Sequence, residues 1–140
     1  MYDRPDAVEL LQAARHHLET TILPLTRDTH HKLYFQTLVA LNVMKIVERE
    51  IDTRDDHFRA EWARLNMLTG NQPLPKDTKT ARSVLKARNA LLCDAIRHGD
   101  YDDSAALFEH LRANSIEQLE VANPKFLAML EAEDAQNTSE

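Results

Sequence analysis

Apolar residues recur at intervals of three and four along most of the chain, a spacing that places them on one side of an α-helix. The pattern is densest over residues 33–51, LYFQTLVALNVMKIVEREI, where apolar side chains occupy most of the helical circumference. A helix that is apolar nearly all round is usually buried by neighbours on several sides. We therefore predict that a helix over about residues 30–53 is the enclosed, central helix of an all-α domain.

Further helices are predicted before and after the central one. The first runs from about Pro5, with Asp3 as a possible cap, to Pro24, where the ring ends or kinks the helix. Asp28 or Thr29 is a plausible N-cap for the central helix. Later helices are expected over about residues 56–69, 78–98 and 104–122, and a short last helix should begin at Pro124.

Capping residues support these boundaries. Short polar side chains favour helix starts, and glycine favours the position just after a helix end. The expected caps and stops are Asp55 or Asp56, Gly70, Asp77 or Thr78, Gly99 and Asn123. The predicted fold is a single-domain, all-α bundle of about five main helices, mostly antiparallel because the connections are short.

Length and composition agree with one helical domain. The chain has 140 residues, enough for a single core, and only two glycines, which disfavours a sheet with tight hairpins. We assign residues 1–132 to the bundle and residues 133–140 to a flexible acidic tail, since the end of the chain is rich in acidic and small polar residues.

Charge and cysteine content narrow the class of protein. The net charge of −6 argues against a nucleic-acid coat, which needs a basic face. No apolar run approaches the roughly 20 residues that span a bilayer, and the N-terminus lacks the apolar segment of a signal peptide. Cys93 is the only cysteine, so no internal disulfide can form, and we expect a buried, inert thiol in a cytoplasmic protein.

Two polar residues interrupt the apolar surface of the central helix. Asn42 and Arg49 are seven positions apart and so nearly aligned, and Asp94 is an acid on another helix with which Arg49 could pair. Asn42, Arg49 and Asp94 are therefore candidate ligand-binding residues of a polar pocket. The alternative, which we favour, is a satisfied structural network that fixes helix register.

A basic stretch marks the start of the helix over residues 78–98 and comprises Lys76, Lys79, Arg82, Lys86 and Arg88. Lys79, Arg82 and Lys86 lie close to one side of it, and such a side could contact a phosphate-bearing ligand or an acidic partner. A charged, solvated face is the simpler interpretation.

Catalytic and metal-binding patterns are missing from the sequence. The seven histidines contain no H-E-x-x-H and no Glu-x-x-His repeat, and adjacent histidine pairs do not readily chelate one metal. Histidines on solvated faces are the better interpretation, although folding could still gather a metal cluster. We predict no catalytic residues, no metal and no cofactor.

Three segments together resemble a bacterial domain family of unknown function. They are YDRPDAVELLQAAR, ALNVMKIVEREI and LRANSIEQLEVANPKFL, and the matching positions are Tyr2, Asp3, Arg4, Pro5, Ala40, Asn42, Arg49, Glu50 and residues 122–126. The resemblance implies an accessory domain found beside or fused to aminoglycoside-phosphotransferase-like kinases, with acyl-CoA dehydrogenases encoded nearby. It assigns no catalytic residues.

Three functional hypotheses follow. The first is a non-catalytic interaction domain that acts with a phosphotransferase-like kinase in acyl-CoA-related metabolism. The second is a bundle that binds a small molecule or CoA thioester near Asn42 and Arg49, and the third is a histidine-dependent metalloprotein. A homodimer is also possible, because Phe58, Trp62, Leu65 and Leu68 form an apolar stripe that serves either as core or as an association surface.

Overall fold

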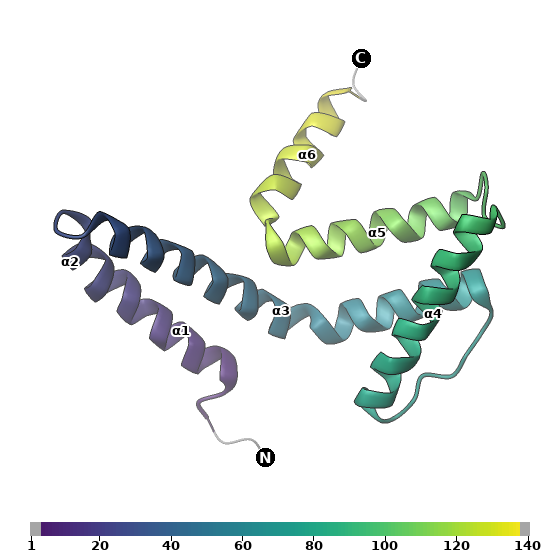
Figure 1. The fold of residues 1–140 in the computed structure, drawn as a ribbon, viewed down its shortest axis with the longest axis horizontal. Coiled ribbons are helices and arrows are strands. Elements are labelled where there is room, and N and C mark those ends of the chain that lie inside the picture. The colour runs from purple at the N-terminus through teal and green to yellow at the C-terminus, as the bar shows by residue number, and fades with distance from the viewer. Residues whose placement is uncertain (1–3, 138–140) are drawn as a thin grey trace.

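The structure is a computed structural model that describes residues 4–137. Within those residues it is all-helical and has no strand, which confirms the predicted fold class of a helical bundle. Figure 1 shows one long helix, α3 (His31–Thr69), with a helical rod beside its first half. Two further helices, α4 (Thr78–His98) and α5 (Ala105–Ala122), lie beside its second half. Every helix in this part of the chain is too short or too polar to traverse a lipid bilayer.

The rod beside the first half of α3 is nearly continuous. It consists of α1 (Ala7–His17), a π-helical turn (Leu18–Ile22) and α2 (Leu23–Arg27). Asp6 begins α1 with a capping box, because its side chain accepts a hydrogen bond from the Glu9 amide while the Glu9 side chain accepts one from the Asp6 amide. The predicted cap Asp3 lies outside the described residues. Pro24 does not end the rod, because the wider π turn just before it relieves the steric conflict that a proline ring creates in a regular helix.

The next helix, α3 (His31–Thr69), contains 39 residues and is about 58 Å long. The prediction of two helices, near 30–53 and 56–69, is therefore wrong. No glycine or proline interrupts this segment, and Asp55 and Asp56, the expected caps, instead form ion pairs with Arg54 and Arg59. The N-cap position is His30 rather than Asp28 or Thr29, and His30 makes no capping hydrogen bond through its side chain.

The remaining helices begin as predicted. They are α4 (Thr78–His98), capped by Asp77, α5 (Ala105–Ala122), capped by Ser104, and α6 (Pro124–Asn137), preceded by Asn123. Gly99 follows α4 with a φ of +85°, a left-handed conformation that glycine adopts without strain. Because α6 continues to Asn137, it extends past residue 132, where we placed the end of the bundle.

The core lies at the second half of α3, where α4 and α5 pack against it. Its buried members are Trp62 and Leu65 of α3, Leu85 and Leu92 of α4 and Leu107 of α5. Phe58 and Leu68 pack against this cluster, so the predicted apolar stripe of α3 is core rather than free surface. The Trp62 indole N–H donates to the Gln72 carbonyl at 3.0 Å and so ties the loop before α4 to the core.

The first half of α3 is not enclosed, which overturns the prediction of a central helix covered on several sides. Thr37 and Leu41 are buried on the side of α3 that faces the rod formed by α1 and α2. On the opposite side, Phe35 is 65% exposed and Val43 is 51% exposed. Figure 1 shows why: α5 ends near the middle of α3, and α6 turns away from α3 instead of continuing along it. Among the described helices, α6 contacts only α5.

The chain consequently exposes more surface than a compact monomer of the same mass. Its accessible surface is 10633 Å². A compact monomer of 16.1 kDa is expected to expose about 7,400 Å². The difference of about 3,200 Å² reflects the extended arrangement of the helices and the apolar side chains left uncovered between them.

Candidate functional site

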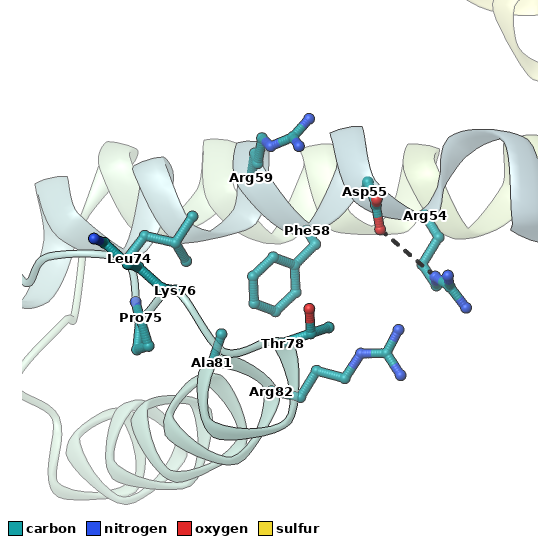
Figure 2. A pocket seen from close by; sticks show the side chains of 10 residues that line it. All are labelled: Arg54, Asp55, Phe58, Arg59, Leu74, Pro75, Lys76, Thr78, Ala81 and Arg82. Atoms are coloured by element: carbon teal, nitrogen blue, oxygen red, sulfur yellow. Dashed lines mark ion pairs between the residues drawn. The ribbon is translucent and has the colours of Figure 1, made fainter. Parts of the chain in front are cut away.

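A small cavity with a basic rim lies between the second half of α3 and the start of α4 (Figure 2). Its volume is about 180 Å³. The Phe58 ring projects from α3 toward Thr78 and Ala81 of α4, while Leu74 and Pro75 of the preceding loop close one side. The loop is held in place through Trp62 and through Asn66, whose side-chain oxygen accepts the Gln72 amide.

Four cationic residues line this cavity, and only one acidic residue does. The cations are Arg54, Arg59, Lys76 and Arg82, and the acid is Asp55. Arg54 pairs with Asp55 at 3.7 Å, so part of its charge is neutralised locally. Arg59 pairs with Asp56 and points to the outer side of α3 (Figure 2). The positive charge that remains at the rim, from Lys76 and Arg82, suits a phosphate or carboxylate group.

The cavity includes only one of the three basic residues singled out from the sequence. Arg82 lines it, whereas Lys79 and Lys86 are exposed on α4 and do not. Sequence reasoning missed Arg54 and Arg59, because they belong to α3 and approach Arg82 only when α4 folds back onto α3. Lys76, which the sequence grouped with the basic stretch, lines the cavity from the loop before α4.

Asn42, Arg49 and Asp94 are not brought together. Asn42 is exposed on the first half of α3. The Arg49 guanidinium Nε donates to the Val121 carbonyl at the end of α5, at 2.7 Å, and Asp94 pairs with Arg97 of its own helix. The expected pairing of Arg49 with Asp94 is therefore wrong, and a ligand-binding role for these residues stays a prediction.

The polar network that the sequence placed around Arg49 exists elsewhere, between α3 and α5. Arg64 of α3 donates through both terminal nitrogens to the Glu117 carboxylate, at 2.8 and 2.6 Å, and also to the Asn114 side-chain oxygen at 2.6 Å. That contact turns the Asn114 amide nitrogen toward Nε2 of His110, 3.2 Å away. Nε2 must then accept, so the neutral His110 ring carries its proton on Nδ1.

The surroundings of His110 favour this neutral form. Burial lowers the pKa of His110 below its ordinary value, and the positive charge of Arg64 lowers it further, while Glu61 and Glu117 oppose the change. His110 is only 2% exposed, so the expectation that the histidines lie on solvated faces fails for this one. A signal for it existed in the sequence, because His110 follows Leu107 by three positions on the apolar side of α5.

Arg88 is a buried cation, which corrects the interpretation of the whole basic stretch as a solvated face. Its side chain is 4% exposed, its guanidinium lies 5.0 Å from the centre of the Trp62 ring, and it donates to Thr69 Oγ1 and the Gly70 carbonyl. These contacts fix the end of α3 against α4. Arg88 therefore acts as part of the core rather than of the basic rim.

Cys93 is exposed, so the prediction of a buried thiol is wrong. It lies on the outer side of α4, next to the buried Leu92. Metal ligands are not gathered by the fold either: among residues 4–137, no group of three or more His, Cys, Asp or Glu side chains is placed to hold a metal ion.

Fold and site together define an all-helical domain with a small basic cavity, a partly buried polar network and an open apolar surface. The chain belongs to the family described as Domain of unknown function (DUF6285), which matches residues 27–126, from the end of α2 to the start of α6. This confirms the resemblance to an uncharacterised domain family. Comparison with curated proteins finds no match, and comparison with solved structures finds none either.

Proposed function

We propose that this chain is a non-catalytic interaction domain that acts with a phosphotransferase-like small-molecule kinase, in acyl-CoA-related metabolism of the bacterial cytoplasm. The observation that carries the proposal is the excess of exposed apolar surface. Monomeric proteins rarely expose contiguous apolar patches beyond a few hundred Å². Here large apolar side chains are exposed on α3, α5 and α6, among them Phe35, Val39, Val43, Phe108, Leu111, Phe126 and Met129. Surfaces of this kind bind other proteins.

The choice of a kinase as partner rests on the family resemblance and on what the sequence lacks. With two glycines, the chain has neither a P-loop nor a glycine-rich nucleotide loop, so it would be the accessory component and not the phosphotransferase. The coupling to acyl-CoA metabolism comes from the resemblance alone.

The test is to purify the chain with the phosphotransferase-like kinase encoded beside it. We expect the two proteins to co-elute in size-exclusion chromatography, and we expect kinase activity to change when the domain is added. A phosphotransferase-like kinase from an unrelated gene neighbourhood is the control and should do neither. If the cognate kinase neither co-elutes nor changes in activity, the proposal is wrong.

A second candidate function is binding of a phosphate-bearing small molecule, and the cavity between α3 and α4 favours it. Its volume of about 180 Å³ is below the roughly 300–1,000 Å³ of most ligand pockets. It would therefore hold a phosphate and a short adjoining group, with the rest of a larger ligand such as a CoA thioester outside. The Phe58 ring offers an apolar contact, and Lys76 and Arg82 line the cavity with further positive charge.

Thermal shift measurements test this function with inorganic phosphate, pyrophosphate, CoA and an acyl-CoA as probes. A ligand at 100 times its Kd adds about 2.7 kcal/mol to stability. We expect at least one probe to stabilise the chain and Arg82→Gln to abolish the effect. Lys86→Gln, one turn further along α4 and outside the cavity, should retain it. Absence of a shift with all four probes would exclude the second function.

A further inference from the structure

The first half of α3 carries an uncovered apolar strip, which we call the bare face. Its residues lie within about 140° of helical circumference and comprise Phe35, Leu38, Val39, Asn42, Val43 and Ile46. Four of them are large apolar side chains with 39–65% of their surface exposed. Thr37 and Leu41, on the opposite side of α3, are buried against the rod formed by α1 and α2.

The bare face continues a surface that already packs against a helix. Further along the same side of α3, the end of α5 is held by the hydrogen bond from Arg49 to the Val121 carbonyl. Beyond this point α5 stops, and α6 leaves α3 (Figure 1). The strip from Phe35 to Ile46 thus has the pattern of a helix-packing surface, but no helix among the described residues lies on it.

The chain as a whole exposes surplus surface on the scale that a stable dimer buries. Obligate homodimers bury about 2,000–5,000 Å² in total, or about 1,000–2,500 Å² from each subunit. The excess of about 3,200 Å² over a compact chain is spread over the open sides of several helices, and the bare face is the part of it on the first half of α3. The chain's own core is small and lies at the other half of α3.

We propose that a second copy of this chain covers the bare face, with the two α3 helices packed antiparallel about a two-fold axis near Asn42. The inference rests on the proposed role as an interaction domain and names the occupant of this one surface. The strip carries no charged side chain, so two copies can meet face to face without repulsion. An asparagine amide both donates and accepts, so the two Asn42 side chains can pair across the axis and fix the register.

Charges flanking the bare face select the antiparallel orientation. Lys32 lies ten residues before Asn42 and Glu50 eight residues after it, on the same side of the helix. Both are exposed, and neither forms an ion pair within the described residues. Antiparallel packing brings Lys32 of each copy near Glu50 of the second copy. Parallel packing would instead place the two Lys32 side chains together and the two Glu50 side chains together.

The first experiment measures the mass of the purified chain by analytical ultracentrifugation over a range of concentrations, without the kinase. We expect a dimer for the natural chain and a monomer for Val43→Glu, which inserts a charge into the apolar contact. Met67→Glu is the matched control, because Met67 is on the same helix and is 86% exposed, and it should remain dimeric. Circular dichroism should show equal helix content in all three, since Val43 contributes no buried side chain within one copy.

The second experiment locates the two-fold axis by disulfide cross-linking. In a Cys93→Ser background, Asn42→Cys should form an intermolecular disulfide on mild oxidation, because the axis brings the two cysteines together. Glu50→Cys should not, because antiparallel packing separates the two positions by about 24 Å along the helices.

Each outcome is decisive. A natural chain that is monomeric at all concentrations overturns the inference. If the bare face binds the kinase instead, the dimer is refuted and the proposed function stands. A dimer that survives Val43→Glu, or that cross-links through Glu50→Cys and not through Asn42→Cys, also overturns it. A dimer with the expected behaviour and no effect on any kinase supports the inference and refutes the kinase partnership.

Discussion

Replacing Leu65 by alanine tests whether stability resides in the core at the second half of α3. Leu65 is 0% exposed and packs among Trp62, Leu85, Leu92 and Leu107. The substitution removes three buried carbon atoms, worth about 0.8 kcal/mol each. It also leaves a cavity whose cost brings typical Leu→Ala losses to about 3–5 kcal/mol. A domain of this size has about 5–15 kcal/mol in total, so the loss is a large share of it.

Urea unfolding followed by Trp62 fluorescence measures the effect, because the indole lies in the same cluster. Met67→Ala is the control two residues away: Met67 is 86% exposed, and its truncation should change stability by less than about 0.5 kcal/mol. Both variants and the natural chain must be compared at one protein concentration, since association adds stability that depends on concentration. A loss below about 1 kcal/mol for Leu65→Ala would show that this cluster does not carry the fold.

Three further predictions concern the contacts that hold the helices in place. Glu48→Gln should lower stability by about 1–2 kcal/mol in urea unfolding, because it weakens the 2.8 Å contact between Arg15 of α1 and Glu48 of α3. Ser104→Ala should cost about 1 kcal/mol in the same assay, because the Ser104 hydroxyl caps α5 through the Leu107 amide; no loss would mean that the cap is dispensable. Since the pKa of His110 is lowered in the folded chain, its neutral form adds stability that is complete above its ordinary value of 6.5 and is lost as pH falls below it. Thermal denaturation between about pH 7 and pH 5 should therefore show a smaller loss on acidification for His110→Gln, and equal slopes would contradict the assignment.

Local sequence signals predicted helix ends correctly where the contacts within a single turn determine them. The starts of α4 and α6 follow from Asp77 and Pro124, and the end of α4 follows from Gly99. The start of α5 was expected at about residue 104, and Ser104 is its cap. A cap acts through a hydrogen bond to an amide two or three residues away, so its effect is visible in sequence. The same reasoning failed at residues 53–56, where two aspartates resemble a cap but each finds an arginine nearby and the helix continues.

The candidate site shows where local reasoning stops. The basic residues near the start of α4 were visible as a group, yet of Lys79, Arg82 and Lys86 only Arg82 lines the cavity, and the fold adds Arg54 and Arg59 from α3. In the same way, the sequence predicted a buried polar network but placed it at Arg49 and Asp94, whereas the structure forms it from Arg64, Asn114, His110 and Glu117.

Periodicity and capping were sufficient for the fold class and for most helix boundaries, because both depend on contacts within a few residues along the chain. They also identified residues 33–51 as apolar nearly all round. They could not say what covers that segment, because hydrophobic spacing shows which side of a helix is apolar and not what lies against that side. The rod from α1 to α2 covers one side of α3. On the other side α5 stops short, and α6, which contacts only α5, turns away from α3. Covering by a neighbouring helix and covering by another molecule leave the same hydrophobic pattern in the sequence.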